Sequence, residues 1–267
     1  ETEGSSGTCG ENLTWIMEDG VLTISGTGRM QDYEPSENPS PWANNAGFVK
    51  VIIEEGVTSI GNYAFYFCPL LSSITIPGSV TSIGNYAFYY CYSLSSITIP
   101  EGVTVIGDSA FCECYLLSSI TIPNSVSSIG DHAFAFCSSL SSITIPGSVT
   151  SIGDCAFVEC DSLENIYFKG KAPTIGYNCF YFVEATAYYP SGDTTWTDDV
   201  KQDYGGNITW VPWEPSADIS YTLDKTSLTI PVNGSEQLTL VGSDGSTGTG
   251  TWESSDPSVA TVDSTGF

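Results

Sequence analysis

Positively charged side chains are almost absent from this sequence. Its 267 residues include only 6 Lys and Arg against 31 Asp and Glu, which gives a net charge of −25 at pH 7. The stretch from residue 51 to residue 168 contains no Lys or Arg. Nucleic acids and anionic membranes are bound by clustered cations, so the sequence argues against both as partners. The six cations are Arg29, Lys50, Lys169, Lys171, Lys201 and Lys225.

Long apolar runs and clusters of histidine are also missing. No apolar run approaches the roughly 20 residues of a membrane-spanning helix, and residues 1–10 lack the basic-then-apolar pattern of a signal peptide. We therefore expect a soluble chain without membrane insertion, whereas secretion stays open. His132 is the single histidine, so a Ser-His-Asp or Cys-His catalytic site would have to include it. The sequence predicts no catalytic residue, no metal site and no cofactor.

A strict internal repeat organises the middle of the chain. Its period is 23 residues, because the segments that start at Ile74 and Ile143, three periods apart, agree at 16 of 23 positions. Two more copies lie between them, and weaker copies start at Val51 and Ile166. The shared pattern is L-x-x-I-x-I-P-x-x-V-x-x-I-G-x-x-A-F-x-x-C, without insertions or deletions. Fixed-length coils that bury their apolar side only against their neighbours require such regularity, so the sequence predicts a solenoid.

Each repeat unit reads as one coil. The Ser-Ile-Thr-Ile stretch alternates polar and apolar β-branched residues, which predicts a short strand with both isoleucines buried. Proline then ends the strand, a glycine makes a turn, and the A-F-x-x-C segment adds an aromatic ring and a thiol to the core. Strands of successive coils should align in parallel. In one unit we expect burial of Ile74, Ile76, Val80, Ile83 and Phe88.

These residues resemble the BspA-like class of leucine-rich repeat, which implies a solenoid with a parallel sheet of short strands. Ahead of the array, CGENLTWIMEDGVLTISGTGRMQDY resembles the cap of such arrays, and two short strands are predicted around Asp19 and Gly20. After it, TAYYPSGDTTWTDDVKQDYGGNITWVPW resembles their closing element. Every tryptophan lies outside the repeats, as expected if bulky residues seal the two ends. They are Trp15, Trp42, Trp196, Trp210, Trp213 and Trp252.

The last fifty residues resemble a bacterial immunoglobulin-like domain of the second group. The resemblance lies in LDKT at residues 223–226 and in SSDPSVATV at residues 254–262. It implies an all-β sandwich that is incomplete here, because the family's pattern continues with two more strands. We therefore divide the chain into an N-terminal cap, a six-unit array, a closing element, a linker and a partial immunoglobulin-like domain, at residues 1–50, 51–188, 189–213, 214–217 and 218–267.

Five of the nine cysteines recur at the repeat spacing and should form one column. Side chains in a column point the same way, whereas a disulfide needs converging Cβ vectors, so we expect a buried and reduced column. Cys112 and Cys155 lie off it, and we expect one or the other of them to react in the folded protein. Cys9 and Cys179 have no obvious partner. The column consists of Cys68, Cys91, Cys114, Cys137 and Cys160.

Two roles stay open for the many acidic residues. Paired carboxylates could carry out glycoside hydrolysis, and the cluster of Asp193, Asp198, Asp199 and Asp203 could hold calcium. We expect instead that the possible catalytic carboxylates and the aspartate cluster both lie on a solvated face of the protein. A narrow solenoid offers no deep pocket, and the cluster does not follow the spacing of an EF-hand loop.

Two surfaces of the predicted solenoid are candidates for binding. Outward strand positions form an uncharged row of hydroxyl groups, which is compatible with a solvated face, a partner-binding face or an ice-binding face. Many aromatic residues lie in the turns of the first two full units, and some of them should pack beneath the cap. Exposed surfaces rich in tyrosine are typical of recognition sites. The candidate partner-binding residues are Ser73, Thr75, Ser96, Thr98, Ser119, Thr121, Ser142, Thr144 and Tyr167 on the strands, and Tyr66, Tyr89 and Tyr90 on the turns.

The resemblance implies a non-enzymatic protein, secreted or on the bacterial cell surface, that recognises or adheres to an extracellular protein or glycan. Uncharged binding faces predict an affinity that depends weakly on salt. Two alternatives remain. One is an enzyme or accessory module of a glycan- or peptide-degrading system, and the other is a structural spacer that displays a further domain. The sequence indicates neither the ligand nor the oligomeric state.

Overall fold

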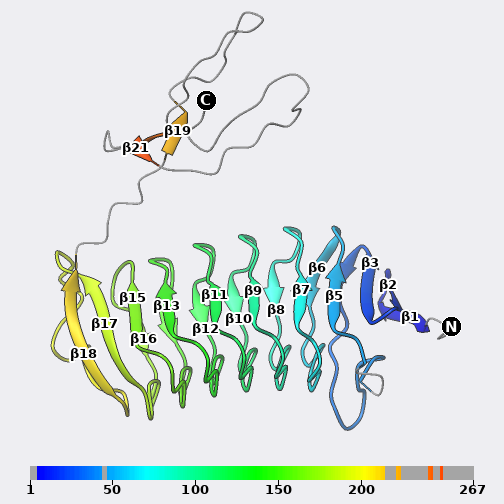
Figure 1. The fold of residues 1–267 in the computed structure, drawn as a ribbon, viewed down its shortest axis with the longest axis horizontal. Coiled ribbons are helices and arrows are strands. Elements are labelled where there is room, and N and C mark those ends of the chain that lie inside the picture. The colour runs from blue at the N-terminus through cyan, green and yellow to red at the C-terminus, as the bar shows by residue number, and fades with distance from the viewer. Residues whose placement is uncertain (1–4, 44–46, 214–220, 224–239, 243–246, 249–267) are drawn as a thin grey trace, which may run out of the picture. The chain divides into compact units, whose positions relative to one another are not determined.

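The computed structural model describes residues 5–43, 47–213, 221–223, 240–242 and 247–248. It divides the chain into two compact units, residues 1–214 and residues 215–267. Figure 1 shows the first unit as a row of stacked coils that runs from the N-terminal strands to the yellow strands before residue 214. No helix occurs among the described residues, so this unit consists of short strands and turns.

The N-terminal cap is an antiparallel sheet of β1 (Ser5–Gly10), β2 (Leu13–Glu18) and β3 (Val21–Gly26). Asp19 and Gly20 join β2 to β3 with positive φ angles of 48° and 75°, which suit the twist of a two-residue hairpin turn. The predicted pair of strands around these residues is confirmed. β3 then pairs in parallel with β5 (Lys50–Ile53), so the cap is continuous with the first coil.

One strand from each coil contributes to the main parallel row. After β5 the row comprises β7 (Ser73–Thr75), β9 (Ser96–Thr98), β11 (Ser119–Thr121), β13 (Ser142–Ile145), β15 (Asn165–Phe168), β17 (Glu184–Pro190) and β18 (Asn207–Trp213). Partners are usually one repeat apart, as in the pairing of Ser96 with Ser119 and of Glu184 with Asn207. The predicted solenoid of parallel strands is confirmed.

A second parallel sheet joins the coils through the segment that precedes the recurring glycine. Ile106, for example, lies opposite Ile83 on one side and Ile129 on the other. The sheet therefore holds each coil to both of its neighbours. Its strands are β4 (Gly28–Arg29), β6 (Val57–Ile60), β8 (Ser82–Ile83), β10 (Val105–Ile106), β12 (Ser128–Ile129), β14 (Ser151–Ile152) and β16 (Thr174–Ile175).

The core is a column of stacked phenylalanine rings. Neighbouring rings lie 5.3–5.8 Å apart, centroid to centroid, and all six are fully buried. Trp42 of the cap begins the column at 5.6 Å from Phe65, and its indole N–H donates to the carbonyl of Ala64 at 2.8 Å. The cap thus extends the column beyond the repeats. Its members are Phe65, Phe88, Phe111, Phe134, Phe157 and Phe180.

The strand isoleucines are buried less uniformly than the sequence predicts. Val80, Ile83 and Phe88 are buried, but Ile74, Ile76 and Ile120 are only half-buried. Strand pairing explains the difference. β7 and β11 do not form a ladder with the strand of the next coil, whereas β9 and β13 do. The next coil therefore covers the isoleucines of β7 and β11 less closely.

The turn of each coil alternates its hydrogen-bond partners. The N–H of Phe65 donates to the Ala87 carbonyl in the next coil at 2.7 Å, whereas the N–H of Tyr66 donates back to Tyr63 at 3.2 Å. Two residues per coil take a left-handed φ between 51° and 62°. That conformation costs a non-glycine residue about 1–2 kcal/mol, which the bonds between coils offset. The two columns are Tyr63, Tyr86, Ser109, His132, Cys155 and Asn178, and Phe67, Tyr90, Glu113, Phe136, Glu159 and Phe182.

An Asn and Asp ladder also links the coils beside the recurring glycine. The side-chain oxygen of Asn85 accepts from the N–H of Asp108 at 2.9 Å, and Asp108 accepts from Asp131 at 3.0 Å. Asp32 of the cap begins the ladder by accepting from the N–H of Asn62 at 2.8 Å. The side chain of each coil therefore bonds to the backbone of the next.

Aromatic side chains close the C-terminal end, as predicted from the tryptophans. Trp196 lies 4.7 Å from Phe168 and 5.6 Å from Trp210, and Tyr204 meets Phe180 edge-on at 6.2 Å. Trp15 and Trp42 have the equivalent place in the cap, 5.9 Å apart. Both ends of the phenylalanine column are thus covered by rings, while Trp252 lies outside the described residues.

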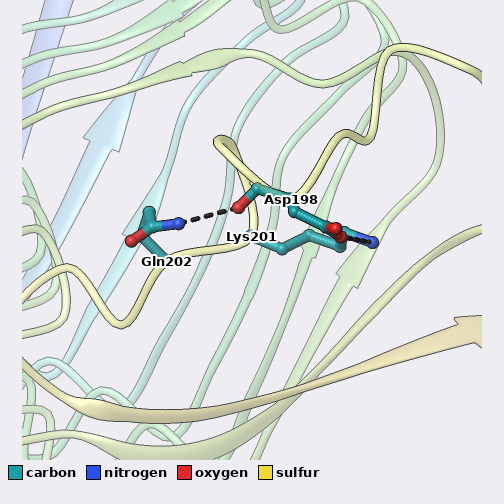
Figure 2. A network of polar contacts seen from close by, with 3 residues as sticks. All are labelled: Asp198, Lys201 and Gln202. Atoms are coloured by element: carbon teal, nitrogen blue, oxygen red, sulfur yellow. Dashed lines mark hydrogen bonds and ion pairs between the residues drawn. The ribbon is translucent and has the colours of Figure 1, made fainter.

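A small polar network holds the loop of the closing segment between β17 and β18. Figure 2 shows the Lys201 ammonium beside the Asp198 carboxylate, 3.0 Å away, and the Gln202 amide donating to the Asp198 backbone oxygen at 2.7 Å. The Lys201 nitrogen also lies 5.1 Å from the centroid of the Tyr189 ring. A carboxylate and a tyrosine therefore bind one lysine between them.

The second unit contributes a three-stranded antiparallel sheet of β19 (Tyr221–Leu223), β20 (Leu240–Gly242) and β21 (Thr247–Gly248). Short antiparallel strands agree with the predicted all-β character of this part. The predicted linker at residues 214–217 and the remainder of residues 218–267 lie outside the described residues.

Candidate functional site

The predicted row of hydroxyl groups is exposed on the strands. Ser96 lies opposite Ser119 and Thr98 opposite Thr121, and all four side chains face solvent. Ser73, Thr75, Ser142 and Thr144 are exposed as well. The strands therefore present a regular, uncharged surface over four coils.

Aromatic rings replace the hydroxyl groups at the C-terminal end of this row. Tyr167 lies opposite Thr144, stacks on Tyr188 at 4.8 Å, and lies 5.5 Å from Trp213. The Lys169 ammonium lies 4.4 Å from the centroid of the Trp213 ring. A cation of the chain itself thus binds this group of rings.

The tyrosines of the turns form a larger surface, here named the turn aromatic cluster. Residues one repeat apart stack almost parallel: Tyr66 on Tyr89 at 5.4 Å with 7° between planes, and Tyr92 on Tyr115 at 5.1 Å with 3°. The predicted Tyr66, Tyr89 and Tyr90 are half-buried within it. Because the coil spacing positions the rings, the surface is preformed. The cluster consists of Tyr63, Tyr66, Phe67, Tyr86, Tyr89, Tyr90, Tyr92 and Tyr115.

Large apolar groups of the same turns lie in solvent. Phe67 is 50% exposed and Tyr115 39%, and beside them in the sequence Leu70 is 52% and Leu116 54% exposed. Scattered exposed apolar residues are ordinary, but a contiguous apolar surface marks an interaction site. The ring contacts from Phe67 through Tyr92 to Tyr115 make this surface continuous over three coils.

A hollow of about 340 Å³ lies between the cap and this cluster. Tyr33, Pro35 and Pro39 line it from the cap, and Tyr66 and Phe67 line it from the first full coil. Part of the turn surface was expected to pack beneath the cap, and the structure places an open, largely aromatic and proline-lined space there. The hollow and the cluster share Tyr63, Tyr66 and Phe67.

Two carboxylates give this aromatic surface a negative charge. Glu113 accepts a hydrogen bond from the hydroxyl of Tyr115, which raises the pKa of that tyrosine. Burial is the main reason that the pKa of Tyr66 and of Tyr92 is raised, and the negative charge of Glu113 adds to this shift. The pKa of Tyr63 is likewise raised mainly by burial, with a smaller contribution from the charge of Glu34. The tyrosine rings therefore remain neutral, and the charge at this surface is the negative charge of the two carboxylates.

The predicted column of cysteines is buried and reduced. Each thiol from Cys91 onward donates to the carbonyl of the column phenylalanine in the preceding coil, at 3.1–3.3 Å. Burial raises the pKa of Cys68 to about 12. Neutral, hydrogen-bonded thiols in the core are structural groups and poor nucleophiles.

The structure distinguishes Cys112 from Cys155, the two candidates for a reactive thiol. Cys112 is buried at 4% exposure, because it packs beneath Tyr89 with Ala135 and Val158 in a small second cluster. Burial raises its pKa to about 12. Only Cys155 is partly accessible, while Cys9 and Cys179 are buried. The large ring of Tyr89 covers a position that the repeat spacing alone leaves on the surface.

The single histidine and the aspartates of the possible calcium cluster have the following settings in the described part of the chain. His132 is exposed in a left-handed turn position, and its equivalents in other coils are Tyr86, Ser109 and Cys155. Asp193 accepts from the N–H and hydroxyl of Thr195, and Asp198 pairs with Lys201. Among the described residues no group of three or more His, Cys, Asp or Glu side chains is arranged to hold a metal ion.

Comparison with family models assigns the repeats. Residues 58–186 match the BspA type leucine rich repeat region in six copies. The array is a BspA-type leucine-rich repeat. Residues 219–267 match the bacterial Ig-like domain of group 2, so both predicted resemblances are confirmed. No curated protein matches the chain.

Solved bacterial leucine-rich repeat proteins are similar to the chain, and the first of those described here shares its fold. A leucine-rich repeat protein of T. pallidum is 24% identical with a TM-score of 0.53, and the match covers 78% of this chain and 97% of that one. A leucine-rich cell surface protein of Faecalibacterium prausnitzii is 28% identical, at a TM-score of 0.42 and coverages of 63% and 55%. A protein of Bacteroides ovatus is 23% identical, at 0.43 and coverages of 75% and 66%.

Several residues of the surface of this BspA-type array escape sequence reasoning. Tyr115 belongs to a third coil, and Tyr33 and Pro39 come from a cap loop without repeat spacing. Glu113 replaces an aromatic residue in its column. The replacement is visible in the sequence, but its role depends on the neighbouring rings.

The described residues include no helix with the length and apolar character needed to cross a membrane.

Proposed function

We propose that this chain is a non-enzymatic recognition protein that binds an extracellular macromolecule through its repeat array. The turn aromatic cluster carries the proposal. It presents stacked rings and phenol hydroxyl groups over three coils, beside a hollow of about 340 Å³. Tyrosine gives a large contact area at a small entropic cost, and rings fixed by the coil spacing lose little freedom on docking.

The family supports a place at the bacterial surface. BspA-type repeat proteins are cell-surface proteins, and the bacterial Ig-like match adds a module of the kind found in modular surface chains. We propose that the protein acts there or after secretion. Its partner is an extracellular protein or a glycan, since the absence of cations from residue 51 to residue 168 disfavours polyanions.

The hydroxyl row of the strands is the second candidate face. It is exposed and regular, and Tyr167 extends it toward Tyr188 and Trp213. The sequence alone favours neither face, whereas the exposed apolar area favours the turns. The strand residues Ser73 to Thr144 remain the alternative.

An array of defined extracellular proteins and glycans tests the proposal with the whole chain. For any ligand found, we expect Tyr89→Lys with Tyr90→Lys to abolish binding and Thr98→Lys with Thr121→Lys to preserve it. Circular dichroism and thermal melting confirm that each variant is folded. Loss of binding only in the strand variant would move the site to the hydroxyl row. Hydrolysis of a peptide or glycan that depends on one carboxylate would replace the proposal with an enzymatic function.

A further inference from the structure

The turn aromatic cluster combines neutral rings with a carboxylate that has no cationic partner. In the described part of the chain the single ion pair joins Lys201 to Asp198, so Glu113 forms none. Glu113 bonds to the hydroxyl of Tyr115, and its charge acts on Tyr66 and Tyr92. A carboxylate beside several ring faces is a favourable environment for an ammonium or guanidinium group.

The closing segment shows the same combination with its cation in place. There the Lys201 nitrogen lies 3.0 Å from an Asp198 oxygen and 5.1 Å from the centroid of the Tyr189 ring, and Figure 2 shows the ion pair. Lys169 similarly lies over the Trp213 ring. At the cluster, by contrast, the chain supplies no lysine or arginine from residue 51 to residue 168. The repeats that form the cluster therefore supply no cation of their own.

We propose that the turn aromatic cluster binds a Lys- or Arg-bearing segment of an extracellular polypeptide, with its cation against Tyr92, Tyr115 and Glu113. This rests on the proposed function and names the partner's chemistry. Charge complementarity supports it, because the chain carries a net charge of −25 and Glu34 adds a second carboxylate beside Tyr63. The weak salt dependence expected for an uncharged face therefore does not apply to this one.

The hollow defines a second requirement of the ligand. Phe67 lines the hollow and lies 6.2 Å from Tyr92, which lies 5.1 Å from Tyr115. An extended chain spans that separation with about three to four residues. The segment bound by the cluster thus has an apolar residue about three positions from its cationic residue, and the apolar side chain enters the hollow between Tyr33, Pro39 and Tyr66.

The test uses the whole chain and the peptide acetyl-(Leu-Gly-Gly-Lys)2-amide as the probe, in which each lysine lies three positions after a leucine. Its control is the same peptide with every lysine acetylated on Nε, which removes the charge and keeps the length. We expect the charged peptide to bind at least about tenfold more tightly by titration calorimetry, and several-fold more weakly at about 300 mM than at about 50 mM NaCl. Equal binding of the acetylated peptide would overturn the proposal.

Two matched variants separate the cluster from the overall negative charge. Glu113→Gln should weaken binding about tenfold, whereas Glu101→Gln, which removes the same charge from an exposed turn after β9, should change it less than twofold. Tyr92→Leu should weaken binding several-fold and Tyr181→Leu, an exposed ring of the sixth coil, should not. Equal losses in Glu113→Gln and Glu101→Gln would show that only net charge attracts the peptide.

Failure of this inference can be told from failure of the proposed function. If the basic peptide does not bind, but a defined extracellular ligand binds the wild type and not the variant with Tyr89→Lys and Tyr90→Lys, the cationic assignment is wrong and recognition stands. If neither the peptide nor any macromolecule of the array binds the whole chain, both are wrong. Melting temperatures of the single variants within a few degrees of the wild type confirm that binding, not folding, has changed.

Discussion

The thiol of Cys114 donates a hydrogen bond of 3.3 Å to the backbone carbonyl of Phe88, one coil earlier in the stack. The same carbonyl accepts from the N–H of Cys91 in its own coil at 3.2 Å. Cysteine therefore joins successive coils beside the phenylalanine rings, through a side chain small enough to leave the rings stacked. Because the bond repeats in the later coils, the column of thiols acts as a structural ladder.

Thiol labelling should separate one cysteine from the other eight. In the folded protein we expect a maleimide to react at Cys155, which is the only partly accessible cysteine, and at the rest only after denaturation. The pKa of Cys155 is raised by burial and by Asp154 and Asp131, so its reaction should be slow at pH 7 and faster toward pH 9. Peptide mass spectrometry locates the label. Native labelling of Cys112 would contradict the cover that Tyr89 provides.

The raised pKa values of the thiols predict a loss of stability in alkali. An unfolded thiol ionises near its usual pKa of 9.0, whereas burial holds the pKa of Cys68 and Cys160 at about 12 in the folded protein. Folding thus keeps protons that unfolding releases. The contribution to stability is complete below pH 9 and is lost as the pH rises toward 12, by up to about 1.4 kcal/mol per pH unit for each thiol.

Urea titrations at several pH values measure this slope. We expect the midpoint to fall steadily above pH 9, and Cys114→Ala to fall less steeply than the wild type because one titrating group has been removed. Constant midpoints between pH 8 and pH 10.5 would show that the thiols do not ionise on unfolding. Circular dichroism at each pH monitors the secondary structure during the titration.

The fold could be predicted because one pattern recurs without a change of length. The 23-residue period predicts the row of strands, the buried thiols, and the burial of Val80, Ile83 and Phe88. The partial exposure of Ile74 does not, because it depends on where ladders between particular strands are interrupted. Pairing between coils is decided by the geometry of the whole stack, which a single unit does not contain.

The candidate site was only partly predictable, for a different reason. Tyr66, Tyr89 and Tyr90 were visible as an excess of rings at one position in the repeat. The hollow needs Tyr33 and Pro39, which come from a loop of the cap that has no periodic pattern. Contacts between a repeat and an irregular segment are set by tertiary packing, and no local signal reports them.

Shortening one ring of the phenylalanine column should destabilise the protein strongly. Phe111 is fully buried and stacks on Phe88 and Phe134 at 5.3 and 5.5 Å, so Phe111→Ala leaves a cavity that neither neighbour can fill. We expect a loss of about 3–5 kcal/mol in the free energy of unfolding, measured by urea denaturation. Phe182→Ala, at a ring that is 65% exposed, should cost less than about 1 kcal/mol. Similar losses in the two variants would contradict the stacked core.

Glycine recurs in every coil because neighbouring coils approach too closely there for a side chain. A pair of alanine substitutions can test this explanation. The sequence predicts a turn at this glycine, yet Gly107 does not have a left-handed φ. Instead, a Cβ at Gly107 would lie 2.7 Å from the carbonyl carbon of Gly84 and 2.8 Å from the nitrogen of Asn85. Backbone atoms cannot yield as a flexible side chain can, so Gly107→Ala must push two coils apart.

Gly78 supplies the control, because a Cβ there would meet only the carboxylate of Glu55, at 3.9 Å. We expect Gly107→Ala to lower the free energy of unfolding by about 1–3 kcal/mol through overpacking, and Gly78→Ala to change it by less than about 1 kcal/mol. Urea denaturation of both variants gives the comparison. An unchanged midpoint for Gly107→Ala would mean that the coils can separate there at little cost, and the recurrence of glycine in every coil would then need another explanation than close approach.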